Sequence, residues 1–158
     1  MLGDEFRKAR SRCIEYQGKT VCLYDVIEVP PECQLKVRFE STNSEWRQGI
    51  WLGYMQPTKR KTDLRLTVGD VTAPGLDLWA DTSPPEVLVH VRAPGGIVHV
   101  YNRWQKPGDF AAWSQLFGAG MLIEVSEDGR FRRYRCNDGH PEPTFDHLVF
   151  SIEILDPN

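Results

Sequence analysis

Alternation of apolar and polar residues in short runs is the feature of this sequence that most limits its fold. Apolar and polar side chains alternate at residues 35–39, and the pattern returns at 64–68, 87–92 and 150–154. A period of two places every second side chain on one side of an extended chain, which is typical of a β-strand with one buried face. Less regular apolar runs that fit the same interpretation lie at residues 21–24, 50–54, 97–103, 121–125 and 131–135.

Residues that favour turns separate these runs. Gln17-Gly18 and Asp128-Gly129 each stand between two runs, where glycine supplies the positive φ of a tight hairpin, and residues 93–96 are expected to do the same. Eleven prolines exclude long helices from most of the chain. We therefore expect an all-β fold of about nine to eleven short strands, arranged as a two-sheet antiparallel sandwich or jelly roll.

Three segments outside these strands carry separate expectations. Asp109 is a candidate N-cap for one or two helical turns over residues 109–117, and Gly118 favours termination there. Residues 1–12 are polar and are expected to form a short helix or to be frayed. The basic run Lys59-Arg60-Lys61 is expected at a solvated hairpin tip.

Length and charge limit the classes of function. A chain of 158 residues is expected to form one domain, residues 1–158. The 19 basic and 22 acidic residues give a net charge of −3, which disfavours wrapping around nucleic acid, so no nucleic-acid partner is expected. No apolar run is long enough to cross a membrane, and the polar N-terminus lacks a secretion signal, so we expect a cytoplasmic protein without a membrane partner.

The four cysteines permit two disulfides in three pairings. Disulfides are rare in the reducing cytoplasm, and a chain of this size can build a core without them, so we expect four reduced, mostly buried thiols. Cys136 and His140 have a C-x3-H spacing, but no second pair accompanies them, and no metal site is predicted.

Carboxylates and amides near the expected strand ends leave one cofactor open. Oxygen-rich loops of a sandwich can hold Ca²⁺, but the D-x-D-x-D-G spacing of a dedicated calcium loop is missing from the sequence. No cofactor is therefore expected, with calcium as the alternative. The residues concerned are Asp77, Asp81, Asn137, Asp138 and Asp146.

The five tryptophans are the strongest pointer to function. Trp46, Trp79 and Trp104 stand beside polar residues near expected strand ends. A flat indole next to hydrogen-bonding groups suits a carbohydrate or another small polar ligand, and the same residue types form hot spots in protein interfaces. Core packing is the alternative for each tryptophan, above all for Trp51 with its apolar neighbours. The candidate binding residues are Trp46, Arg47, Trp79, Asp81, Asn102, Arg103, Trp104 and Asp138.

Four arginines lie at residues 130–135 around two aromatic residues. Alternation places Arg133 and Arg135 on the face opposite Arg132 and Tyr134. Such a strand could bind phosphate or RNA, but pairing with acids such as Glu124 across the hairpin is the commoner arrangement.

Catalytic motifs are missing from the sequence. It contains no G-x-S-x-G, H-E-x-x-H, Walker A or G-x-G-x-x-G pattern, so no catalytic residue is predicted. Five segments resemble short single-domain bacterial proteins of unassigned function, a resemblance that implies no activity. The expected architecture resembles carbohydrate-binding modules in fold class alone. The five segments are WRQGIWLG (46–53), LWADTSPP (78–85), VYNRW (100–104), RYRCNDG (133–139) and FDHLVFSIEI (145–154).

Together these features predict a non-catalytic binding or accessory domain. We expect it to recognise a protein partner through a rim of loop aromatics and arginines. The alternative is a module that binds a carbohydrate or a small polar ligand. An enzyme of unknown class is the third and least favoured hypothesis.

Overall fold

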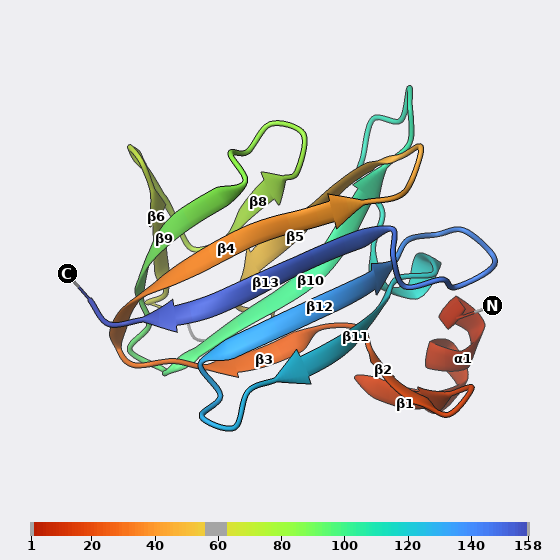
Figure 1. Ribbon diagram of the computed structural model, residues 1–158, viewed down its shortest axis with the longest axis horizontal. Coiled ribbons are helices and arrows are strands. Elements are labelled where there is room, and N and C mark those ends of the chain that lie inside the picture. The colour runs from red at the N-terminus through yellow and green to blue at the C-terminus, as the bar shows by residue number, and fades with distance from the viewer. Residues whose placement is uncertain (1, 56–62, 158) are drawn as a thin grey trace.

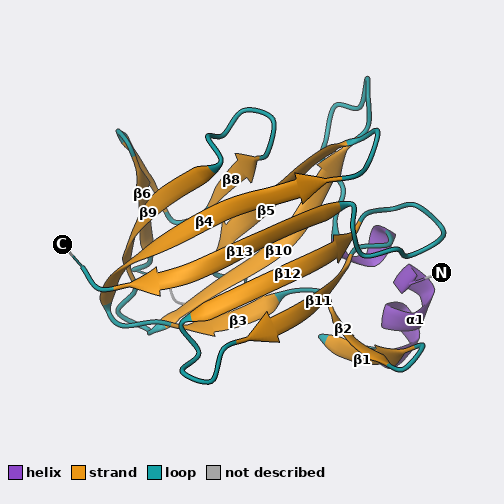
Figure 2. Ribbon diagram, viewed as in Figure 1, coloured by secondary structure: helices purple, strands orange, loops and turns teal. Residues whose placement is uncertain are grey.

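Two antiparallel sheets pack face to face in the computed structural model, which describes residues 2–55 and 63–157 (Figure 1). The large sheet has nine strands in the order β1-β2-β11-β12-β13-β4-β9-β6-β7, and the small sheet has four in the order β3-β10-β5-β8. Strands dominate, and the helical segments are short and lie beside one end of the sandwich (Figure 2). The all-β sandwich predicted from the sequence is confirmed.

Thirteen strands are present in the part of the chain that the structure describes, and the short β3, β7 and β8 were not predicted as strands. The elements are α1 (Leu2–Ala9), β1 (Cys13–Tyr16), β2 (Lys19–Cys22), β3 (Asp25–Glu28), β4 (Glu32–Thr42), β5 (Arg47–Gly53), β6 (Arg65–Val68), β7 (Val71–Ala73), β8 (Leu76–Trp79), β9 (Glu86–Arg92), β10 (Ile97–Gln105), the 3-10 helix η1 (Gln115–Phe117), β11 (Gly120–Val125), β12 (Phe131–Asn137) and β13 (Leu148–Leu155). The predicted hairpin tip at residues 59–61 lies outside the described residues.

The alternating runs produce the core between the sheets. In β9, Val87, Val89 and Val91 are buried while Leu88 points outward and is exposed. In β13, Ser151 was expected in water but is buried. It pairs with Arg133 on one side and Arg38 on the other, and long side chains beside a small residue can cover it.

The turn at residues 93–96 differs from its prediction. Gly96 has the expected positive φ of 73°, but β9 pairs in the large sheet and β10 in the small one. The turn therefore crosses from one sheet to the other and closes no hairpin. Gly18 and Gly129, with φ of 78° and 74°, do close the predicted hairpins β1–β2 and β11–β12.

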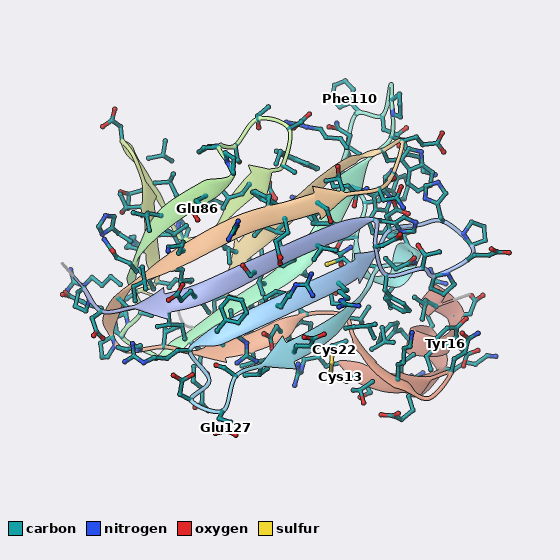
Figure 3. All side chains as sticks on the ribbon, viewed as in Figure 1. Cys13, Tyr16, Cys22, Glu86, Phe110 and Glu127 are labelled. Atoms are coloured by element: carbon teal, nitrogen blue, oxygen red, sulfur yellow. A yellow bond between two sulfur atoms is a disulfide. The ribbon has the colours of Figure 1, made fainter. Side chains whose placement is uncertain are left out.

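The N-terminal segment forms a small unit at the edge of the large sheet. Leu2 and Phe6 of α1 are buried against β2, so the helical alternative for residues 1–12 is confirmed from Leu2 to Ala9. Cys13 and Cys22 lie directly opposite each other in the β1–β2 hairpin and form a disulfide (Figure 3). The prediction of four reduced thiols is therefore wrong for this pair.

The remaining two cysteines are free and buried, as predicted. Cys33 lies in β4 and Cys136 in β12, both packed in the core between the sheets. Burial raises the pKa of each thiol, and the rise is largest for the fully buried Cys136. Neither thiol is therefore a ready nucleophile.

Of the one to two helical turns predicted over residues 109–117, one is present. Only Gln115–Phe117 is helical, as one 3-10 turn that ends at Gly118 with a φ of 111°. Asp109 caps no helix, because its carboxylate accepts a hydrogen bond from Trp113 Nε1 at 2.8 Å. Trp113 also forms an isolated β-bridge with Trp104, which holds the segment extended. Among the described helices, none is long and apolar enough to span a membrane.

A buried ion pair joins the two sheets. Arg132 of β12 donates two hydrogen bonds to the carboxylate of Asp25 in β3, at 2.6 and 3.0 Å, and the Tyr134 hydroxyl donates a third at 2.6 Å. Burial and this carboxylate raise the pKa of Tyr134 well above its usual value. Arg135 faces outward and pairs with Glu124 across the hairpin, as predicted.

Candidate binding site

Four loops form a rim at one end of the sandwich (Figure 1). They are the β4–β5 loop (43–46), the β8–β9 loop (80–85), the segment after β10 (106–114) and the β12–β13 loop (138–147). Two shallow grooves of about 330 and 490 Å³ lie at this rim, and Trp46, Arg47 and Asp81 border both. These three residues were predicted from the sequence to bind a ligand or partner.

Arg47 links the rim to the outer face of the small sheet. Its Nε atom lies 2.9 and 3.0 Å from the two carboxylate oxygens of Asp81, and its guanidinium lies 4.3 Å from the centre of the Trp79 ring. Trp46 lies at the other side of the rim, where Lys106 Nζ is 4.7 Å from the ring centre. The structure thus brings together Arg47, Trp79 and Asp81, with Trp46 nearby.

None of the other four predicted residues borders the two grooves. Trp104 is 1% exposed and Asn102 0%, because both lie on the inward side of β10 with Val98 and Val100. The predicted surface patch is therefore wrong for these two. Arg103 points outward on the same strand and pairs with Asp77 of β8. Asp138 is fully buried beneath the rim.

Three aromatic rings lie on the outer surface of the small sheet, and we call them the aromatic face: Trp51, Trp79 and Tyr101. Trp51 and Tyr101 are opposite each other on β5 and β10, with ring centres 5.1 Å apart and planes 22° apart. Trp79 stands one strand further along, on β8. Trp51 was expected in the core, but Ile50 and Leu52 occupy the inward positions and leave it outward.

Glycines beneath the indoles let them lie flat on the sheet. Gly49 faces Trp79 across the β5–β8 pair, and a Cβ at this position would lie 2.6 Å from Trp79 Cε3. Gly53 and Gly75 lie under Trp51 in the same way; a Cβ on Gly75 would be 2.9 Å from its Cζ2 atom. Each indole therefore has one face against the backbone.

Ion pairs alternate with the rings on this surface. Arg103 of β10 pairs with Asp77 of β8, and Arg47 pairs with Asp81 beyond Trp79. Partial burial raises the pKa of Tyr101; nearby Arg103 lowers it and Asp77 raises it again, and the net direction is upward. Tyr101 therefore stays a neutral hydroxyl that can both donate and accept hydrogen bonds.

His99 lies next to the aromatic face on β10 and is buried. Tyr54 stacks on its ring, with centres 5.0 Å apart, and Tyr24 meets the ring edge-on at 5.4 Å. His99 Nδ1 accepts a hydrogen bond from the Met55 amide at 2.8 Å, so this nitrogen carries no proton. Burial lowers the pKa of His99, and the nearby Arg12 lowers it further.

Asp138 is the centre of a hydrogen-bond network beneath the rim. Its Oδ2 accepts from Ser44 Oγ at 2.7 Å and Gln48 Nε2 at 3.0 Å. Its Oδ1 lies 2.5 Å from His140 Nδ1 and 3.3 Å from His147 Nδ1. The network ties the β4–β5 loop to the β12–β13 loop.

The pKa values of the two histidines in this network shift in opposite directions. Burial lowers the pKa of His147, whose Nδ1 accepts a hydrogen bond from the Asp138 amide at 3.0 Å. His140 is also desolvated, but its hydrogen bonds with Asp138 and Glu45 outweigh that effect and raise its pKa. The Trp46 indole stacks on the His140 ring at 3.8 Å. The buried cluster thus holds one rim aromatic in place.

The loop oxygens considered for calcium do not converge. Asp77 and Asp81 pair with arginines on the outer face, and Asp146 accepts hydrogen bonds from Asn43 and Thr144. Asn137 is buried and donates hydrogen bonds to the carbonyls of Gly118 and Asp138.

Sequence reasoning missed His147, Trp51 and Tyr101. His147 follows Asp138 and His140 within one loop, and this D-x-H…H pattern was a readable signal. Comparison with models of protein families, with curated protein sequences and with solved structures gives no match to this chain. The function is therefore inferred from the geometry of the site.

Proposed function

We propose that this chain is a non-catalytic module that binds an extended carbohydrate through its aromatic face. The observation that carries the proposal is that Trp51 and Trp79 lie flat on glycines across the outer surface of the small sheet. A sugar ring offers an apolar face of C–H groups, and a flat indole offers the matching surface. The proposal corresponds to the second of the functions that the sequence suggested.

The spacing of the rings favours a chain of sugars over a single one. Trp51 and Trp79 lie on neighbouring strands and two positions apart, which puts their Cα atoms on the order of 8 Å from each other. A ligand that contacts both indoles must extend beyond one sugar ring. An unbranched oligosaccharide fits this requirement.

Hydrogen-bonding groups stand where the hydroxyls of such a ligand would lie. The Arg103–Asp77 pair flanks the rings and presents donors and acceptors in fixed directions. The Arg47 guanidinium, paired with Asp81, lies over the outer face of the Trp79 indole and would have to turn aside for a sugar to stack there. Neutral Tyr101 adds a hydroxyl. This mixture of flat apolar surface and a few oriented polar groups is what carbohydrate recognition requires.

The disulfide bears on the cellular compartment in which the protein would bind its ligand. A cytoplasmic location was expected from the polar N-terminus without a secretion signal, and reduced thiols were expected from that location. Disulfides form and persist in oxidising compartments, so Cys13–Cys22 supports a location outside the cytosol, where most polysaccharides are found. We therefore include an oxidising compartment in the proposal.

Affinity electrophoresis tests the proposal. The purified chain runs through native gels that contain soluble β-glucan, xylan or mannan, beside Trp51→Ala and Trp79→Ala. At least one polysaccharide should retard the unchanged protein, and both variants should lose most of that retardation because the flat surface is removed. Near-ultraviolet circular dichroism checks that the variants are folded.

Trp113→Ala is the matched control. Trp113 is an exposed tryptophan that lies outside the small sheet, on the segment after β10. The Trp113→Ala variant should be retarded like the unchanged protein. Retardation that survives in both Trp51→Ala and Trp79→Ala, or no retardation by any polysaccharide in the panel, would contradict the proposal.

A protein partner at the rim stays the second candidate. Four exposed apolar side chains favour it: Phe110 and Trp113 on the segment after β10, and Leu116 and Phe117 on η1. Phe110 is 106% exposed at the tip of its loop (Figure 3). Aromatic residues are enriched in interface hot spots. A photoreactive phenylalanine analogue at position 110 should then capture one defined protein, whereas the analogue at exposed Leu88 should not.

A further inference from the structure

We propose that Asp138, His140 and His147 form a binding site for a divalent transition-metal cation of the Zn²⁺ class. One donor atom from each of the three residues lies within 4.8 Å of the other two. Carboxylate oxygen and imidazole nitrogen are standard ligands of Zn²⁺ in proteins. The proposal is independent of the carbohydrate hypothesis, since the cluster lies beneath the rim and not on the aromatic face.

The donor atoms already approach the geometry of a coordination shell. Both imidazoles present Nδ1 to Asp138 Oδ1, at 2.5 Å from His140 and 3.3 Å from His147. Two ligands of a tetrahedral Zn²⁺ lie about 3.3 Å apart, given bonds of about 2 Å. The His147 contact matches this distance, and the His140 contact must open by less than 1 Å. The cation would take the place of the proton between His140 and Asp138.

The far atom of each ligand is held by a second residue. His140 Nε2 lies 3.2 Å from Glu45 Oε1, and His147 Nε2 lies 3.3 Å from Thr144 Oγ1. The second oxygen of Asp138 accepts the hydrogen bonds from Ser44 and Gln48. Imidazoles that bind metals almost always donate their other N–H to such a partner, which fixes the ring and its tautomer.

Burial makes the site suitable for holding a cation. Asp138 is 0% and His147 7% exposed, and Trp46 covers the ring of His140. A buried carboxylate is costly without a positive partner, and a bound cation would supply one. With three protein ligands, a water molecule would complete the tetrahedron.

The donor set also selects the kind of metal. Two imidazole nitrogens and one carboxylate suit Zn²⁺, Co²⁺ or Ni²⁺, whereas Ca²⁺ and Mg²⁺ prefer shells of oxygen. All three ligands lie on the β12–β13 loop, so bound metal would cross-link this loop, and the contacts of Ser44 with Asp138 and of Glu45 with His140 would hold the β4–β5 loop against it. Bound metal would thereby fix Trp46 at the rim.

Hydrogen bonding alone is the competing explanation. The Asp138 amide donates to His147 Nδ1 at 3.0 Å, and a metal would have to take over that lone pair. If the cluster serves only to hold the loops together by hydrogen bonds, it will bind no metal at micromolar metal concentrations. The two explanations therefore differ in a direct measurement.

Titration of the full chain with Co²⁺ and Zn²⁺ provides that measurement. The protein is stripped with a chelator, and Co²⁺ binding is followed by its visible absorption, with Zn²⁺ as competitor. We expect one Co²⁺ per chain with a tetrahedral spectrum, displaced by Zn²⁺, and a higher melting temperature with Zn²⁺. Saturation by Ca²⁺ with no binding of Co²⁺ or Zn²⁺ would overturn the proposal, as would no saturable binding of either transition metal.

Three variants locate the site. His147→Gln should abolish binding. Glu45→Gln should weaken it about 10–100-fold, since its exposed side chain supports His140 without being a ligand. His90→Gln, at an exposed histidine on β9, should bind like the unchanged protein. Should His147→Gln fail to fold, Glu45→Gln still decides: unchanged affinity in that variant places the metal elsewhere and overturns the proposal.

Discussion

At the scale of single residues, Gly49 decides whether the Trp79 indole can lie on the sheet. A Cβ here would lie 2.6 Å from the indole and 2.8 Å from the Leu78 carbonyl oxygen, and the backbone oxygen cannot move aside cheaply. We predict that Gly49→Ala lowers the free energy of unfolding by about 1–3 kcal/mol and tilts the ring. Urea denaturation measures the first effect, and near-ultraviolet circular dichroism the second.

Gly95→Ala is the control for this prediction. Gly95 lies in the turn between the sheets, has no positive φ, and a Cβ on it would meet nothing within 4 Å. This variant should be as stable as the unchanged protein, or slightly more stable because alanine restricts the unfolded chain. Equal stability of Gly49→Ala and Gly95→Ala would show that the Trp79 indole does not pack against Gly49.

The sequence held more information on the tryptophans than the prediction used. Alternation shows which residues share a face of a strand. Ile50 and Leu52 are inward, which already places Trp51 outward; Trp104 shares the parity of Val98 and is therefore inward. Polar neighbours were a weaker guide than parity, because Arg103 beside Trp104 simply points the other way.

At the scale of elements, the β1–β2 hairpin owes its disulfide to its turn. A turn at Gln17-Gly18 pairs residues equally distant on either side, and Cys13 and Cys22 are such a pair. The prediction of this turn was correct, and it contained the signal for the bridge. Reduced thiols were predicted because disulfides are rare in the cytoplasm, although the pairing of Cys13 with Cys22 across the turn was the stronger evidence.

Thiol labelling tests this bridge. Denatured protein should take up two labels without reduction and four after it, because Cys33 and Cys136 are free. Cys13→Ser with Cys22→Ser should lower the free energy of unfolding by roughly 2–3 kcal/mol, since the bridge closes a short loop in the unfolded chain. Four labels without prior reduction would contradict the disulfide.

The segment at 109–117 shows the limit of pattern reading at this scale. Its apolar spacing favoured a helix, but its residues form hydrogen bonds with other elements of the fold. Trp113 bridges to buried Trp104, and Arg7 of α1 donates a hydrogen bond to the Leu116 carbonyl oxygen. A single-sequence pattern contains no information about Arg7, which is 109 residues from Leu116 along the chain.

At the scale of the whole molecule, the fold class followed from the sequence but the strand order did not. The turn at 93–96 has the chemistry of a hairpin whether the next strand returns to the same sheet or crosses to the other. The aromatic face could not be predicted for the same reason, because β5, β8 and β10 each contribute part of it. Spatial neighbours from distant segments required the structure.

The response of stability to pH also belongs to the whole molecule. The lowered pKa of His99 means that the folded chain binds this proton less tightly than the unfolded chain. The contribution of His99 to the free energy of unfolding is complete above pH 6.5, the usual pKa of histidine. It is lost as the pH falls through the lower pKa of the folded chain. His147 acts in the same direction, whereas the raised pKa of His140 opposes both, because its contribution is present below 6.5 and is lost at higher pH.

Protonation of His99 also has a structural cost. Its Nδ1 accepts the hydrogen bond from the Met55 amide, and a proton on that nitrogen would break this bond while the ring is buried against Tyr54 and Tyr24. We predict that the free energy of unfolding, measured by urea denaturation at several pH values, declines as pH is lowered from 7 to about 5. His99→Gln should flatten this decline, and the exposed-site variant His90→Gln should leave it unchanged. Equal slopes in His99→Gln and the unchanged protein would contradict the prediction, because the pKa of His99 would then be the same in the folded and unfolded chains.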